Sequence, residues 1–227
     1  MRPESRWACL LLVCGVVAAG CAYYNTFYNA RTSYEQARKL ARENPEHPSA
    51  LEAELLTSAI YGAGKVISVY PESRWVDDAQ LLIGDASLLL GQRSTTGSGT
   101  SNFQDAMLAY SSVLVITDDQ EMRDRAGLGI GRAAMELGRY MDAAAALETV
   151  SADDEDRFYI SRILLADALL QESRTDRALA LLDTLEEPSD DSLSAELELA
   201  RGRVLLAEGQ PDSAAVLCLR AGDIFGR

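Results

Sequence analysis

The sequence predicts an all-α fold, an α-solenoid in which pairs of helices repeat along the chain. From about residue 30, apolar residues recur with a helical period, and no run alternates in the way that strands do. A pattern of small residues repeats about every 35 residues, which is typical of stacked helical hairpins. Proline is confined to the expected joints between helices, where it interrupts no helical hydrogen bond. These joint prolines are Pro45, Pro48, Pro71, Pro188 and Pro211.

The repeated pattern is a small residue followed twelve positions later by an alanine. We expect each pair to mark the closest approach of two antiparallel helices, because a larger side chain would push the helices apart. Gly138 and Gly209 lie seven positions after the first small residue, where the chain must turn. The pairs are Gly131 with Ala143, Ala166 with Ala178, and Gly202 with Ala214.

The same pattern extends upstream in a modified form. Gly84 and Ala106 take the two roles but lie 22 residues apart, and the extra residues form the Ser-, Thr- and Gly-rich stretch 93–101. This composition predicts a flexible loop. Ala59 and Ala63 begin a further second-helix pattern. A generic helical bundle is the alternative to a solenoid.

These registers resemble the tetratricopeptide repeat (TPR), a helix-turn-helix unit of about 34 residues. The segment from Tyr70 to Ala79 is similar to the sequence that joins successive repeats in bacterial envelope TPR proteins. The resemblance covers roughly residues 30–227. It implies a right-handed solenoid of helical hairpins that binds other proteins.

The N-terminus has the features of a secretory signal. Arg2 and Arg6 precede the uncharged apolar run 7–19, which is too short to span a bilayer. The following Val17–Cys21 stretch resembles the lipobox of bacterial lipoproteins, which implies cleavage before Cys21 and lipidation of its thiol. The expected organisation is a signal peptide at 1–20, a lipidated cysteine with an aromatic tether at 21–30, and a helical repeat domain at 31–227. An ordinary signal peptide is the alternative.

Two expectations follow for the mature chain. The tether is rich in aromatic residues, which either dock on the first helices or contact lipid at the membrane interface. Cys9 and Cys14 leave with the signal and Cys21 takes the lipid, so Cys218 has no disulfide partner. Because Cys218 falls on an apolar helical face, we expect it to be buried.

Charge and motifs exclude several function classes. The net charge of -14 does not suit nucleic-acid binding, and one histidine, His47, leaves little basis for histidine catalysis. Acidic clusters fall at the expected joints without the spacing of a calcium loop, so we interpret them as helix caps. Thr117 with Gln120 and Ser49 with Glu52 have capping-box spacing. We predict no metal, no cofactor and no catalytic residue.

By resemblance, a partner would bind along the first helices of the repeats. Their ninth positions carry charges of alternating sign, and their fifth and twelfth positions are apolar. The same apolar residues could instead pack between helices. The candidate residues are Asp85, Leu128, Arg132, Met135, Ile163, Asp167, Leu170, Leu199, Arg203 and Leu206, with Leu81 and Leu88 in equivalent places.

The function predicted is that of a scaffold for envelope proteins, anchored to the outer membrane through Cys21 and facing the periplasm. It would act in outer-membrane protein assembly or secretion. The alternatives are a periplasmic carrier of a lipid or small ligand and a cell-wall enzyme accessory. No hydrolase, zinc-protease or phosphate-loop motif is present in the sequence to favour an enzyme.

Overall fold

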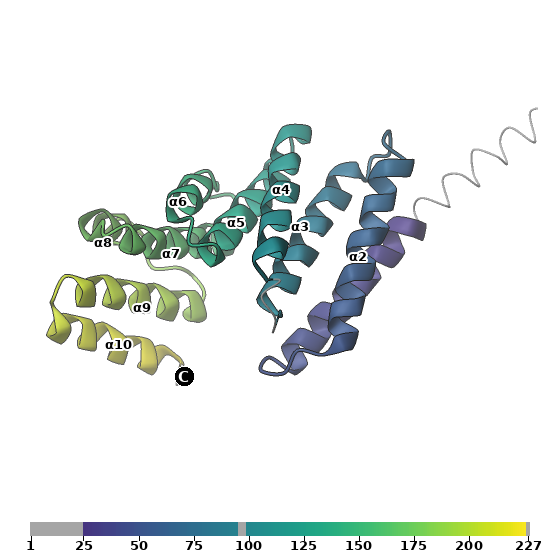
Figure 1. Cartoon of the computed structure of the whole chain (residues 1–227). Helices are drawn as coiled ribbons and strands as arrows, with labels where there is room; N and C mark the ends of the chain where they lie inside the picture. The colour runs from purple at the N-terminus through teal and green to yellow at the C-terminus, as the bar shows by residue number, and fades with distance from the viewer. Residues whose placement is uncertain (1–24, 95–98, 226–227) are drawn as a thin grey trace, which may run out of the picture. The chain divides into compact units, whose positions relative to one another are not determined.

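The computed structural model describes residues 25–94 and 99–225, and all regular structure within these ranges is helical. The predicted all-α class is therefore confirmed. The predicted signal peptide and Cys21 lie outside the described residues. Residues 25–43 form the first helix. The others are α2 (Ala50–Val69), α3 (Val76–Gln92), α4 (Gly99–Ile116), α5 (Gln120–Glu136), α6 (Tyr140–Glu148), α7 (Glu155–Gln171), α8 (Thr175–Asp183), α9 (Asp191–Ala207) and α10 (Pro211–Phe225) (Figure 1).

The chain divides into two compact units, residues 1–102 and 103–227. In the first unit, the first helix packs against α2 and α3. Gly62 of α2 lies so close to Ala30 that a Cβ at Gly62 would be 2.8 Å from the Ala30 Cβ. Ala37 is fully buried beside Leu56. Small residues thus bring these helices together.

Two of the described aromatic residues after the predicted lipidation site, Phe27 and Tyr34, dock on the domain. Phe27 is buried and stacks on Trp75, with ring centroids 5.1 Å apart. Tyr34 packs against the same apolar cluster, whereas Tyr28 is 54% exposed. Residues 25–30, which the sequence assigned to a tether, are the first turns of a helix. Docking is confirmed for Phe27 and Tyr34.

In the second unit, α5–α10 form successive antiparallel hairpins, and α5–α9 share one apolar core. The predicted close approaches occur within it. Ala143 and Ala178 are fully buried, and a Cβ at Gly131 would lie 2.5 Å from the Leu147 side chain. A second tight contact was not predicted. A Cβ at Gly129 would lie only 2.3 Å from the ring of Tyr110 on α4, so α5 is held closely against helices on two sides.

The turns between paired helices are alike. Gly138 and Gly209 adopt left-handed φ angles of 68° and 77°, as their predicted role requires. Ser173 occupies the equivalent place with φ 58°. In each turn this residue donates its N–H three positions back and the next residue donates five positions back, which is a Schellman ending.

Acidic residues cap the first helices of the second unit, as predicted. The side chains of Asp119, Asp154 and Asp190 each accept a hydrogen bond from a backbone N–H in the first turn of α5, α7 and α9. The predicted capping box at Thr117 is wrong: Thr117 accepts from the Asp119 N–H instead, and Asp119 is the cap. Both residue types can cap, and the chain enters the helix at Asp119.

The predicted Ser49–Glu52 capping box is only half formed. Ser49 caps α2 by accepting from the Glu52 N–H at 3.1 Å. The buried Glu52 carboxylate pairs instead with Arg93, which donates its Nε at 2.6 Å. Arg93 also donates to the carbonyl oxygens of Asn44 and Pro45, so it ties the end of α3 to the loop before α2.

Two further predictions are corrected. Within the expected loop 93–101, α4 already begins at Gly99, and residues 95–98 lie outside the described residues. Cys218 is exposed, not buried. A Cβ at Gly202 would lie 3.3 Å from its sulfur, so the thiol borders α9, but no described helix covers the outer face of α10.

Candidate protein-binding surfaces

Three arginines fix the stacking of successive hairpins in the second unit. Arg123, Arg162 and Arg201 come from the first helices of their pairs, and each donates to two carbonyl oxygens near the end of the preceding helix. Arg162, for example, donates to Leu147 O at 2.9 Å and Val150 O at 2.7 Å. A cation suits this negative end of a helix dipole. Burial lowers the pKa of the Arg162 guanidinium. The contacts of Arg123 are with Leu114 and Thr117, and those of Arg201 are with Leu182 and Leu185.

The first helices of these hairpins lie side by side, since α7 contacts both α5 and α9. Three of the predicted charged positions therefore fall on neighbouring helices. Arg203 of α9 binds the carboxylate of Asp167 on α7 through Nε at 3.0 Å and Nη2 at 2.9 Å. Arg132 of α5 is half-buried and has no ion pair or hydrogen bond to the side chains that the structure describes. We call Arg132, Asp167 and Arg203 the charged row.

The apolar candidates divide into core and surface residues. Leu128 and Ile163 are buried in the shared core, so they offer little surface to a partner. Met135 and Leu170 are half-buried and pack on the same core, and Leu199 is also half-buried. Leu206 is 60% exposed. The surface beside the charged row is therefore formed by the later apolar residues of each helix.

The remaining candidates belong to the first unit. Asp85 is half-buried on α3, between Leu81 and Leu88, which are both buried. They lie in a separate compact unit from the charged row.

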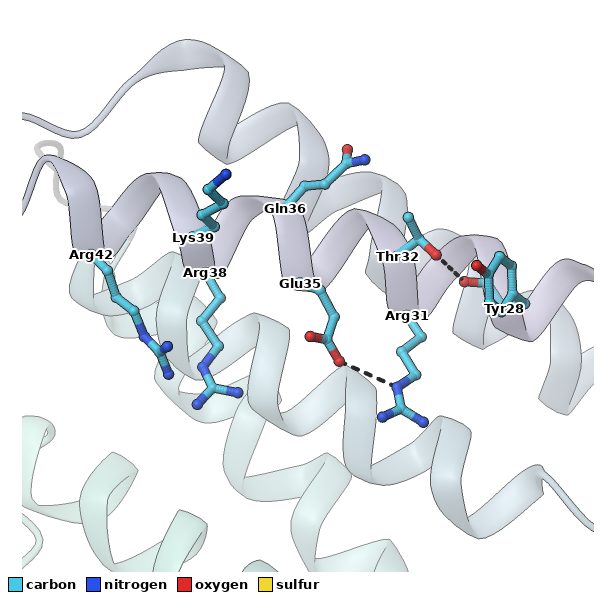
Figure 2. A pocket seen from close by; sticks show the side chains of 8 residues that line it. All are labelled: Tyr28, Arg31, Thr32, Glu35, Gln36, Arg38, Lys39 and Arg42. Carbon is cyan, nitrogen blue, oxygen red and sulfur yellow. Dashed lines mark hydrogen bonds and ion pairs between the residues drawn. The ribbon is translucent and has the colours of Figure 1, made fainter.

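A basic row on the first helix was missed by the sequence reasoning. Arg31, Arg38 and Arg42 lie seven and four residues apart and are exposed, on a stripe beside the face that buries Phe27 and Ala37. Figure 2 shows these three arginines and Glu35 pointing to the same side of the helix. The signal available in the sequence was a helix with four basic and two acidic residues, within a chain of net charge -14.

This basic row borders the concavity drawn in Figure 2, with a volume of about 670 Å³. All eight lining residues belong to the first helix. Arg31 pairs with Glu35 at 3.3 Å, while Arg38 and Arg42 have no ion pair or hydrogen bond within the described ranges. The lining residues are Tyr28, Arg31, Thr32, Glu35, Gln36, Arg38, Lys39 and Arg42.

Other site types are not found in the described part of the chain. No cluster of three or more His, Cys, Asp or Glu side chains is arranged to hold a metal ion there. None of its helices combines the length and the apolar character needed to cross a bilayer.

The comparisons with known proteins agree with this geometry. Residues 128–193 match the family model of the tetratricopeptide repeat. No curated protein matches the chain significantly. Among solved structures, this chain is similar to the nearly identical TPR-like repeats of a candidate kinesin light chain from Podospora anserina, with 19% sequence identity and a TM-score of 0.58. A point variant of that protein has 20% sequence identity to this chain and a TM-score of 0.61. Each match covers 86% of this chain and 93% of the other. The chain has a TPR-like repeat fold.

Proposed function

We propose that this chain is a scaffold that binds other proteins of the bacterial cell envelope while anchored to the outer membrane through a lipid on Cys21. It would face the periplasm and act in outer-membrane protein assembly or secretion. The proposed location and lipid anchor rest on the apolar run 7–19 and the Val17–Cys21 stretch. Two or three acyl chains on one residue make a durable anchor, since one chain alone binds weakly.

The observation that carries the scaffold function is the placement of the charged row. Arg132, Asp167 and Arg203 come from three neighbouring helices and lie at equivalent positions of successive repeats. Asp167 and Arg203 are partly exposed, so their ion pair remains open to solvent and to a partner. Charged groups at the edge of an interface favour specificity and fast association.

Affinity purification from detergent-solubilised envelopes tests the function. The wild-type chain is expected to recover a protein in stoichiometric amount. Replacing two charges, in Arg132→Ala with Arg203→Ala, should lose that protein. Arg139→Ala with Arg177→Ala is the matched control, because both residues are exposed and belong to second helices or their turns. Recovery of no protein, or equal loss in both variants, would contradict the proposal.

The lipid anchor and the outer-membrane location are tested separately, by metabolic labelling with palmitate. Label is expected on the wild-type chain and absent from Cys21→Ser, and the labelled chain should fractionate with the outer membrane. An unlabelled wild-type chain would remove the anchor without affecting the scaffold.

A further inference from the structure

We propose that the basic row of the first helix, Arg31, Arg38 and Arg42, binds an acidic, extended segment of a partner protein through its carboxylates. This inference deepens the scaffold function and rests on it only in assuming a protein partner. It names the chemistry of that partner at a surface separate from the charged row.

The basic row is exposed, whereas the adjoining face of the same helix already has a structural role. Phe27, Ala30 and Ala37 are buried against α2 and α3. Removing the arginines would therefore leave the helix packed. Arg38 and Arg42 form no ion pair or hydrogen bond in the ranges that the structure describes. Arg31 shares its charge with Glu35 at 3.3 Å between two well-exposed side chains, a weak pair that a partner carboxylate can replace.

Charge complementarity identifies the occupant. The chain as a whole carries a charge of -14, so its field repels acidic molecules in general. An acidic segment would be drawn to the first helix specifically, where basic residues outnumber acidic ones. Guanidinium groups bind carboxylates in a two-pronged geometry that suits this role better than ammonium groups do.

The spacing fits an extended segment. Arg38 and Arg42 are four residues apart, or about 6 Å along the helix axis. Alternate residues of an extended chain lie about 7 Å apart on one face. Carboxylates at alternate positions can therefore meet Arg38 and Arg42, the two arginines of the row without an ion pair in the described ranges. The concavity of about 670 Å³ beside the row leaves room for the side chains of such a segment.

The test is fluorescence anisotropy with a labelled peptide of alternating glutamate and serine, long enough to span the row. The full mature chain is kept in non-ionic detergent. We expect binding that weakens as salt rises, because the contacts are ionic. Arg31→Gln, Arg38→Gln and Arg42→Gln together should weaken binding about tenfold or more. A glutamine-serine peptide should not bind.

The matched control removes the same number of positive charges from the second unit. Arg139→Gln, Arg174→Gln and Arg177→Gln replace three exposed arginines of the second unit and should leave peptide binding unchanged. Circular-dichroism melting curves of both triple variants that match the wild-type curve would show that folding is intact. Equal weakening in both variants, or no binding by the wild type, would overturn the proposal.

Two further arms separate this proposal from others. Arg132→Ala with Arg203→Ala is expected to bind the peptide normally while losing the envelope partner, so the two surfaces can fail independently. Phosphatidylglycerol vesicles test the lipid alternative with Cys21→Ser chains. One outcome would overturn the proposal in favour of lipid. In it, the peptide fails to bind, and the vesicles bind Cys21→Ser more tightly than they bind Cys21→Ser carrying the three arginine substitutions. The basic row would then bind lipid headgroups and not an acidic protein segment.

Discussion

Arg203 donates hydrogen bonds to the Asp167 carboxylate from Nε at 3.0 Å and from Nη2 at 2.9 Å, although the residues are 36 positions apart in the sequence. The contact joins equivalent positions of successive repeats. Both side chains are partly exposed, at 47% and 27%, so solvent screens the pair. We predict from a double-mutant cycle with Asp167→Asn and Arg203→Gln a coupling free energy of about 0.5–1 kcal/mol. A coupling indistinguishable from zero would contradict this prediction and would mean that the pair does not stabilise the contact between the two repeats.

The glycines of α5 are required by close packing. Gly129→Ala would place a Cβ against the Tyr110 ring, so we expect a loss of about 1–3 kcal/mol in the free energy of unfolding, measured by urea denaturation. Gly222→Ala is the matched control. It is also helical but has no atom within 4 Å of the new Cβ, so it should be neutral or slightly stabilising. The packing explanation is wrong if the two substitutions have the same effect.

Ser173 is the exception among the three turn residues. It holds φ 58° where the other repeats place Gly138 and Gly209. A side chain is strained in this region, so Ser173→Gly should raise the free energy of unfolding by about 0.5–1 kcal/mol. Gly138→Ala should lower it by a similar amount. A destabilised Ser173→Gly would show that the serine side chain has a role of its own.

Glu155 makes stability depend on pH. Its exposed carboxylate accepts hydrogen bonds from the Ser189 N–H and hydroxyl, both at 2.8 Å, and the backbone bond is the main cause that lowers its pKa. A lowered folded pKa adds stability above the unfolded value, and this stability is lost as pH falls through the folded value. Relative to Glu155→Gln, the wild-type advantage should therefore shrink as pH falls through the ordinary glutamate value of about 4.3 and below it. A difference independent of pH would contradict this assignment.

The sequence predicted the repeat because the close approach of two helices restricts which residues fit. Gly131 opposite Leu147 shows how directly that restriction acts. It also predicted the turn glycines, since a left-handed residue is needed there. Ser173 escaped notice because a strained serine leaves no compositional signal.

The errors arose where tertiary context decides. Threonine and aspartate both cap helices, so only the path of the chain selects Asp119 over Thr117. The burial of Cys218 depends on what covers α10, which the pattern within that helix does not encode. For the candidate surface, spacing placed Arg132, Asp167 and Arg203 at equivalent positions of successive repeats, but did not show that Leu128 and Ile163 belong to the core.

Crosslinking in intact cells tests the scaffold most directly. Photoreactive residues at positions 132, 167 and 203 are compared with positions 145 and 180, which are exposed alanines on the second helices α6 and α8. We predict that one discrete protein is crosslinked from the charged row and not from the two alanine positions. Absence of any crosslinked protein, or the same products from both sets, would contradict the claim that this surface binds a partner.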